Sequence, residues 1–154
     1  MRSMKWIMAG TAAAAALGYT AVAMANDPAP AGPGIVVYKT ATCGCCGKWV
    51  EHLRANGFTV KAEDVTDLAA VKQRYGVGLQ LQSCHTAVVG DYVFEGHVPA
   101  DAIEKFLAKP PANARGLAVP GMPPGSPGME SASAQPYDIL VFDRTGATKV
   151  FEHR

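Results

Sequence analysis

The sequence predicts an α/β fold, because segments with strand and helix patterns alternate along it. Residues 35–39 form a short, β-branched run that is typical of a buried strand. Residues 45–56 carry apolar side chains at helical spacing, and Gly57 is a suitable C-terminal stop. Residues 58–62 alternate apolar and polar side chains and predict a second strand. A strand, a helix and a strand in this order predict a crossover between parallel strands.

The next elements are expected to be a short helix, a β-hairpin and a final helix, each bounded by cap or turn residues. The hairpin would add an antiparallel edge to the sheet, and the complete order is βαβα–ββα. We expect a short helix that is capped by Thr66 and runs through Tyr75, and hairpin strands at 86–89 and 92–94 around Gly90-Asp91. The final helix is expected to have Pro99 at its first position and to stop at Pro110-Pro111.

Composition divides the chain into five segments. Residues 1–25 have a basic start, an alanine-rich apolar run and an A-x-A pattern, which together predict a signal peptide cleaved before Asn26. An uncleaved membrane anchor is the alternative, and the scarcity of Leu and Ile disfavours it. We expect a flexible lead-in at 26–34, the main domain at 35–118, a Pro/Gly/Met loop at 119–136, and a C-terminal hairpin packed on the domain at 137–154.

The charge balance argues against a nucleic-acid partner. Cleavage would remove two positive and no negative residues, so the formal net charge of +1 would become −1. No basic patch remains to attract phosphates, and no second apolar run is long enough to span a bilayer. We therefore expect a periplasmic protein without stable membrane insertion after cleavage, in a compartment that oxidises unprotected cysteines.

Three of the four cysteines lie in the run Thr42-Cys43-Gly44-Cys45-Cys46-Gly47, directly after the first predicted strand. Cys43 and Cys46 are three residues apart, so they share one face at the start of a helix. A helix N-terminus also favours the thiolate form of cysteine. A C-x-x-C pair in this position predicts a thioredoxin-like redox site, but the same pair suits half a zinc site or a soft-metal site.

Cys84 helps to separate these alternatives. We expect it just before the third strand, beside the helix that carries the other cysteines. Thioredoxins have a cis-proline at this place, whereas residues 82–86 (QSCHT) contain no proline. A third thiolate and the imidazole of His85 there favour metal binding. In an exported protein, thiolate, thioether and imidazole ligands indicate copper, and Cu(I) in particular.

The remaining histidines differ in their surroundings. His85 adjoins Cys84, and His97 lies in a turn before the final helix, so each is either a ligand or an ordinary polar residue. His52 is expected on the surface of the first helix. His153 lies near the chain end and is expected to be frayed and without a role.

Met122 and Met129 lie in the Pro/Gly loop, which could fold over the cysteines. Most such segments are linkers, and most methionines fill gaps in packing. Met122 is the better candidate of the two because it is closer to the expected core. Whether Cys45 is a ligand or only packs is left open.

The chain contains four distinctive motifs: 40–46 (TATCGCC), 83–87 (SCHTA), 95–100 (EGHVPA) and 116–130 (GLAVPGMPPGSPGME). Together they resemble the CopG-type family of small periplasmic copper-resistance proteins, long described as a domain of unknown function and distinct from the DNA-binding repressor of the same name. The resemblance covers about residues 35–130. It implies a thioredoxin-like domain that binds several copper ions and interconverts Cu(I) and Cu(II), at a site of Cys43, Cys46 and Cys84 with Met122 and His97.

The leading hypothesis is an exported copper-binding protein in which Cys43 and Cys46 are both ligands and a catalytic dithiol/disulfide couple. Copper-dependent oxidoreductase activity would follow, with copper ions and other periplasmic copper-handling proteins as partners. The alternatives are a thiol–disulfide oxidoreductase acting on proteins, a copper chaperone without redox turnover, and an inactive disulfide-stapled domain. The candidate metal ligands are Cys43, Cys45, Cys46, Cys84, His85, His97, Met122 and Met129.

Overall fold

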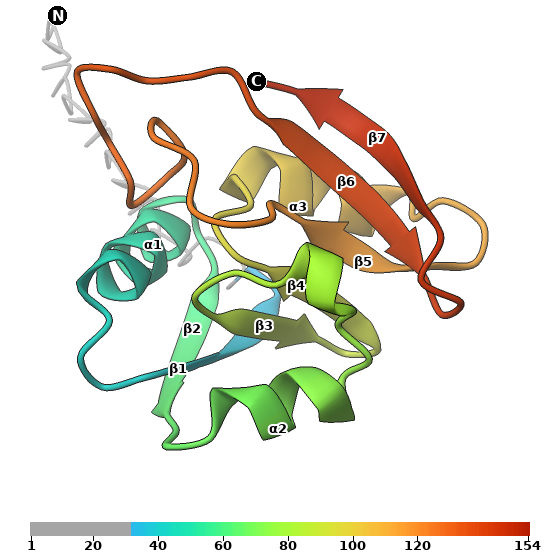
Figure 1. Ribbon diagram of the computed structural model, residues 1–154, viewed down its shortest axis with the longest axis horizontal. Coiled ribbons are helices and arrows are strands. Elements are labelled where there is room, and N and C mark those ends of the chain that lie inside the picture. The colour runs from blue at the N-terminus through green and yellow to red at the C-terminus, as the bar shows by residue number, and fades with distance from the viewer. Residues whose placement is uncertain (1–31) are drawn as a thin grey trace, which may run out of the picture.

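The computed structural model describes residues 32–154, so the predicted signal peptide and its cleavage site lie outside the described residues. Within residues 32–154, no helix is long and apolar enough to cross a membrane. The described elements are β1 (Gly34–Lys39), α1 (Gly44–Ala55), β2 (Thr59–Asp64), α2 (Leu68–Arg74), a 3₁₀ turn (Leu79–Leu81), β3 (Thr86–Val89), β4 (Tyr92–Glu95), α3 (Ala100–Ala108), β5 (Ala114–Ala118), β6 (Asp138–Asp143) and β7 (Thr148–His153) (Figure 1).

All strands belong to one seven-stranded sheet with the order β2-β1-β3-β4-β5-β6-β7. β1 pairs with β2 in parallel, as the strand–helix–strand pattern predicts, and β3 and β4 form the expected antiparallel hairpin. The α/β class and the order βαβα–ββα are therefore confirmed. The expected edge position of the hairpin is wrong: β3 pairs with β1 and β4 pairs with β5, so the hairpin lies in the middle of the sheet.

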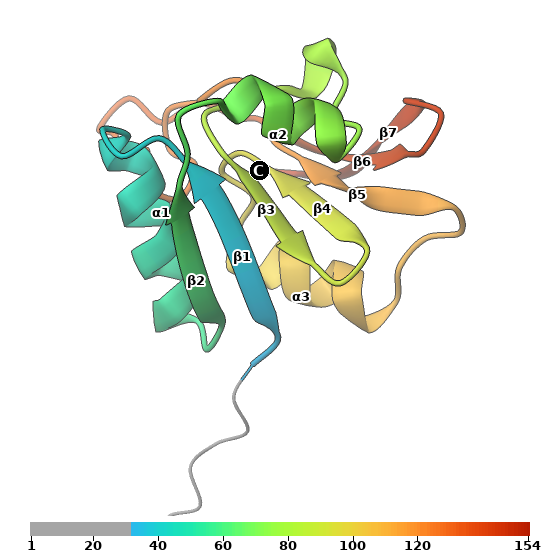
Figure 2. The ribbon, with the colours of Figure 1, turned by 90° about the horizontal axis from the view of Figure 1, so that it is seen from below.

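The helices cover the two faces of the sheet unequally. α1 and α3 pack on one face, whereas α2 lies on the other side of β1 and β3 (Figures 1 and 2). Because side chains alternate along a strand, Phe94 joins the core under α1 and α3, and its neighbour Val93 joins a smaller core on the opposite face. Trp49 from α1 and Phe106 from α3 are fully buried in the larger core.

The local signals for α1 are confirmed. Trp49, Val50 and Leu53 form its buried face. Gly57 follows the helix with a φ of 87°, a left-handed conformation that glycine adopts without a steric penalty. The start of α1 is thus fixed close to the end of β1, and this places the cysteine run at one end of the sheet.

The caps of the other helices differ from the prediction. Asp67, and not Thr66, caps α2, because its carboxylate accepts a hydrogen bond of 2.9 Å from the Ala70 N–H. α3 begins after Pro99. Its first N–H, that of Ala100, donates to His52 Nε2 at 3.1 Å. His52 is therefore a half-buried cap and not a free surface residue.

The prediction missed β5, which connects the main domain to the C-terminal hairpin. A side chain at Gly116 would overlap the Val93 carbonyl oxygen, so this position requires glycine. Because glycine is uncommon inside strands, the sequence of β5 lacks a clear strand pattern. β6 pairs with β5, so the C-terminal hairpin extends the sheet. His153 is not frayed: it lies in β7 with Nδ1 2.6 Å from Asp138 Oδ1.

Candidate metal centre

Three cysteines lie at the start of α1, at the end of the sheet where β1 finishes. Cys43 is the N-cap residue, and Cys46 follows it in the first turn. Their sulfurs form a disulfide with an Sγ–Sγ distance of 2.01 Å. Cys45 remains a free thiol, and its Sγ lies 3.5 Å from that of Cys43.

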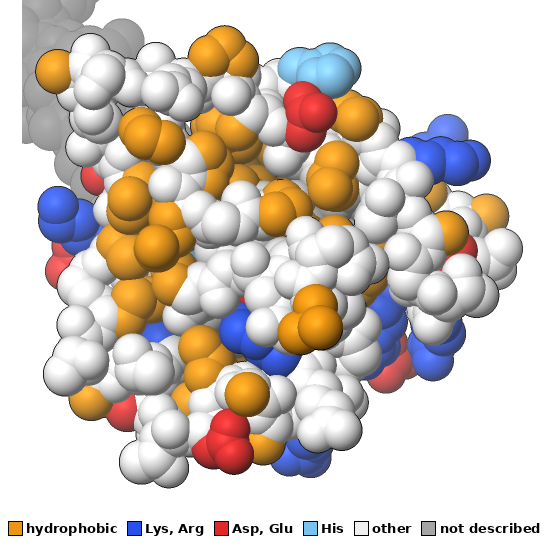
Figure 3. Space-filling model, viewed as in Figure 1, with side chains coloured by type: hydrophobic (Ala, Val, Ile, Leu, Met, Phe, Trp, Pro, Cys, Tyr) orange, Lys and Arg blue, Asp and Glu red, His pale blue; other side chains and the backbone are white. Residues whose placement is uncertain are grey.

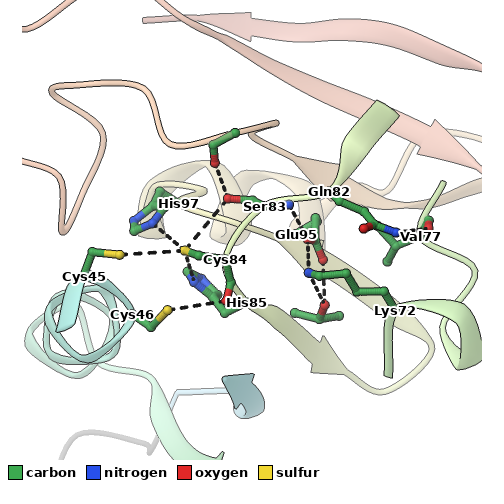
Figure 4. Close-up of polar contacts among 12 residues, drawn as sticks. Cys45, Cys46, Lys72, Val77, Gln82, Ser83, Cys84, His85, Glu95 and His97 are labelled. Atoms are coloured by element: carbon green, nitrogen blue, oxygen red, sulfur yellow. Dashed lines mark hydrogen bonds and ion pairs between the residues drawn. The ribbon is translucent and has the colours of Figure 1, made fainter. Parts of the chain in front are cut away.

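Cys84 joins this group from the segment between the 3₁₀ turn and β3. Its Sγ lies 3.9 Å from Cys45 Sγ, and its carbonyl oxygen lies 3.6 Å from Cys46 Sγ (Figure 4). The four sulfurs, those of Cys43, Cys45, Cys46 and Cys84, all lie within 4.8 Å of one another. The fold thus brings together soft donors from segments about forty residues apart.

His97 approaches Cys84 from the turn after β4. Its Nε2 lies 2.9 Å from Cys84 Sγ, and its Nδ1 lies 2.7 Å from the Pro127 carbonyl oxygen. A carbonyl only accepts, so Nδ1 carries the hydrogen and Nε2 presents its lone pair to Cys84 Sγ. Metal-binding histidines are commonly oriented by such a bond from their other nitrogen. His97 is therefore held in a tautomer that can bind a metal.

His85 lies on the other side of Cys84 and completes a second candidate ligand group. Its Nδ1 is 3.3 Å from Cys84 Sγ, and its ring packs against Trp49 with centroids 4.3 Å apart. Its Nε2 is buried without a hydrogen-bond partner among the described residues. The two ring nitrogens of an imidazole point in different directions, so the candidate ligand atom of His85 beside Cys84 is Nδ1 and not this unpaired Nε2. Ligand atoms of Cys84, His85 and His97 also lie within 4.8 Å of one another.

Burial sets the protonation states at this centre. Burial, together with the neighbouring Cys45 thiol, raises the pKa of Cys84 to about 12. Burial also lowers the pKa of His85 and the pKa of His97. At neutral pH the Cys84 thiol is therefore protonated and both imidazoles are neutral. Metal binding would displace the Cys84 proton, whereas the imidazoles already have their metal-binding form.

The Pro/Gly/Met loop lies against the start of α1, with Gly128 at the closest approach. Gly128 has a φ of 86°, and a Cβ there would lie 2.8 Å from Cys45 O and 2.9 Å from Trp49 N. Glycine is therefore required for the loop to reach the helix. The same approach places the Pro127 carbonyl against His97.

The two candidate methionines differ in position. Met129 lines an open groove of about 520 Å³ together with Cys45 and Lys48. Met122 is 51% exposed and is absent from the lining of that groove. Met122 was the better ligand candidate from the sequence, because it is closer along the chain to the expected core. In the folded loop, however, it is Met129 that lines the groove beside Cys45. A ligand role for either methionine remains a prediction.

Sequence reasoning missed a buried ion pair behind Cys84. Lys72 from α2 and Glu95 at the end of β4 are 4% and 0% exposed, and their charged ends are in contact. Burial raises the pKa of Glu95, and the Lys72 ammonium acts in the opposite direction. The sequence contains one signal for this buried pair: Glu95 directly follows the apolar run 92–94 and lies two residues before His97.

The surface beside the centre carries few charges. On the face shown in Figure 3, hydrophobic side chains, a class that includes cysteine and methionine there, gather over α1, and most charged side chains lie nearer the rim. Lys48 and Glu130 are the charged residues that line the groove beside Cys45. The groove beside Cys45 thus carries one positive and one negative side chain among small and apolar residues.

The α/β sheet and this cluster of thiols and imidazoles define a small protein with a cysteine-rich candidate metal centre. A family model described as "Protein of unknown function, DUF411" matches residues 81–129, which include Cys84, His85, His97 and both loop methionines. The comparison with curated proteins finds no match.

Two solved structures resemble the whole described fold. The chain is 44% identical to "Copper resistance protein copG- Form 1", with a TM-score of 0.74, and 43% identical to the corresponding Form 2, with a TM-score of 0.75. In both cases the match covers 79% of this chain and 98% of the other. The chain belongs to the family of the copper resistance protein CopG, as its four motifs suggested.

Proposed function

We propose that this chain is an exported copper-resistance protein that binds copper through cysteine thiolates and couples Cu(I)/Cu(II) conversion to the Cys43–Cys46 pair. One observation carries the proposal: the two sulfurs that form the disulfide also belong to the four-sulfur cluster. A sulfur in a disulfide is no longer a thiolate, and the thiolate is the form that binds metal. The number of soft ligands would therefore depend on the oxidation state of this pair.

The chemistry balances with copper as the only other reactant. Two Cu(II) ions accept one electron each, the thiols of Cys43 and Cys46 form a disulfide, and two protons are released. Cu(I) prefers soft ligands, so the remaining thiols of Cys45 and Cys84 are suitable acceptors for it. The reverse reaction would return the electrons and regenerate the dithiol.

Copper is the metal that the surroundings support best. The neutral imidazoles of His85 and His97 flank Cys84, and the names of the two similar structures connect relatives of this chain with copper resistance. Imidazole and thiolate together suit copper ions better than they suit hard cations such as Mg²⁺ or Ca²⁺.

Export to the periplasm is part of the proposal. The signal-peptide pattern in residues 1–25 supports it, and so does a site whose redox pair would work in an oxidising compartment. Other periplasmic copper-handling proteins would then supply or receive the ions.

The coupling predicts a fixed ratio of copper reduced to thiol lost. We expect the fully reduced protein, mixed with Cu(II) without oxygen, to form one Cu(I) for each thiol consumed, with the Cys43–Cys46 disulfide as the main product. A colorimetric Cu(I) chelator, thiol titration and peptide mass mapping measure these quantities. Cys46→Ser should slow Cu(I) formation by at least about tenfold, because the second thiol of the couple is missing.

Two other outcomes would contradict the coupling. Tight Cu(I) binding with no thiol loss after Cu(II) addition would indicate a chaperone without redox turnover. Rapid exchange of the pair with protein dithiols in the absence of copper, together with no Cu(I) formation, would indicate a thiol–disulfide oxidoreductase.

A further inference from the structure

The buried ion pair of Lys72 and Glu95 has no role in the chemistry described above. We propose that Glu95 of this pair is a positioning residue for the metal centre, whose side-chain oxygens accept the hydrogen bonds that fix the segment carrying Cys84 and His85, so that both face α1 and His97. This inference rests on the proposed function, because it concerns the geometry of the same copper site.

The contacts of Glu95 connect it to both sides of that segment. Glu95 Oε1 accepts a hydrogen bond of 2.7 Å from the Ser83 N–H, and Oε2 accepts one of 2.7 Å from the Thr86 hydroxyl. Lys72 Nζ contacts Glu95 Oε1 and lies 3.1 Å from Thr86 Oγ1. Ser83 and Thr86 are the residues immediately before Cys84 and after His85, so one carboxylate clamps both ends of the ligand pair (Figure 4).

The segment needs such a clamp because it is not part of a regular strand. β3 begins only at Thr86, and the residues just before it lie between the 3₁₀ turn and the sheet. Backbone bonds hold the Gln82 carbonyl, to Gly121 N at 3.2 Å, and the His85 carbonyl, to Gly96 N at 3.1 Å. Ser83 also forms an isolated parallel bridge with Gly121, and its hydroxyl donates to the Gly121 carbonyl. The Ser83 N–H instead depends on the carboxylate of Glu95.

Glu95 also connects this segment to the loop over the site. Its own backbone oxygen accepts a hydrogen bond of 3.0 Å from Val119 N, at the start of the Pro/Gly/Met loop. His97, two residues further along, receives its orientation from the same loop through Pro127 O. Glu95 therefore lies where the Cys84 segment, the His97 turn and the loop meet.

Stability alone does not account for burying two charges at this place. Replacing a buried ion pair by apolar residues of similar size is often neutral or stabilising, because the desolvation of both charges is costly. An apolar pair could fill the same space, but it could not accept the hydrogen bond that the Ser83 N–H donates. The directed hydrogen bond is what distinguishes the polar pair, and it lies next to Cys84.

Two double variants separate positioning from stability. In Glu95→Gln/Lys72→Met both charges are removed, but an amide oxygen remains to accept the Ser83 N–H. In Glu95→Leu/Lys72→Met the acceptor is removed as well. The matched control is Lys105→Met/Glu152→Gln, which removes an exposed ion pair of 3.1 Å. The full chain is expressed for export, purified, reduced, and titrated anaerobically with Cu(I) against a competing chelator.

We expect the Cu(I) affinities of the control and of Glu95→Gln/Lys72→Met (the Gln/Met variant) to lie within about threefold of the wild-type affinity. Glu95→Leu/Lys72→Met (the Leu/Met variant) should lose about 10- to 100-fold in Cu(I) affinity. Copper-edge X-ray absorption of the Leu/Met variant should show fewer sulfur ligands per copper. The unfolding midpoints of the two copper-free double variants should be similar. Equal copper affinity and equal spectra for both double variants would overturn the inference.

A smaller change keeps the test decisive if the Leu/Met variant does not fold. Thr86→Val removes a donor to Glu95 Oε2 at nearly constant volume, and we expect it to weaken Cu(I) binding about threefold to tenfold. Unchanged binding in Thr86→Val would count against positioning. Failure of the wild-type protein to bind Cu(I) would instead overturn the proposed function, so the two failures are distinguishable.

Discussion

Replacing Cys84 by serine is expected to lower the affinity for Cu(I) by more than about 100-fold, the largest effect of any single substitution considered. Cys84 belongs to both candidate ligand groups: its Sγ lies 3.9 Å from Cys45 Sγ and 2.9 Å from His97 Nε2. A serine hydroxyl is a hard donor with a high pKa, so it replaces neither contact as a Cu(I) ligand. Anaerobic titration against a competing Cu(I) chelator measures the change.

Cys45→Ser is the matched control for this substitution. Cys45 belongs to the four-sulfur group but not to the group of Cys84, His85 and His97. We therefore expect Cys45→Ser to reduce the number of bound copper ions while at least one ion remains tightly held. Wild-type affinity in the Cys84→Ser variant would contradict the assignment of Cys84 as the central ligand.

The second large effect is expected at Gly128. In Gly128→Ala the new Cβ would meet Cys45 O at 2.8 Å and Trp49 N at 2.9 Å, both of them backbone atoms that cannot rotate away. The loop would have to move off α1, and His97 would lose the Pro127 carbonyl that orients its ring. We expect Cu(I) affinity to fall by about 10- to 100-fold, as for other losses of a bond that orients a ligand.

Gly146→Ala separates this clash from the cost of the backbone conformation. Gly146 has the same φ of 86° in the β6–β7 turn, and a Cβ there meets nothing within 4 Å. Gly146→Ala should lose about 1–2 kcal/mol of folding stability, because an L-residue is forced into the left-handed region, and Gly128→Ala should lose at least as much because it also clashes with α1. Only Gly128→Ala should lose copper. Equal copper binding by the two variants would show that the loop does not support the centre.

The sequence predicted those elements whose signals are local. The spacing of Trp49, Val50 and Leu53 defines α1, and Gly57 ends it, so the position of the cysteine run after β1 followed directly. β5 could not be found in the same way. Its glycine at 116 is explained only by the close approach of β4, and its partners, β4 and β6, lie far away in the sequence.

For the candidate site, too, the local motifs were predictable, whereas the contacts that depend on the fold of the loop were not. The C-x-x-C run after one strand and Cys84 before another pointed to a single cluster, and the structure brings these residues together. The bond between His97 and Pro127 and the reach of Met129 into the groove depend on how the loop folds, which its composition does not specify. Lys72 was overlooked because a lysine in a short helix is usually solvated.

We expect the oxidation state of Cys43 and Cys46 to control how much copper the protein holds. The most direct test is to count the Cu(I) ions retained per chain, without oxygen, by the fully reduced protein and by the protein with the Cys43–Cys46 disulfide formed beforehand. We expect more than one Cu(I) per chain in the reduced protein and clearly fewer in the oxidised one. The same number in both forms, or no retained copper in the reduced form, would contradict it.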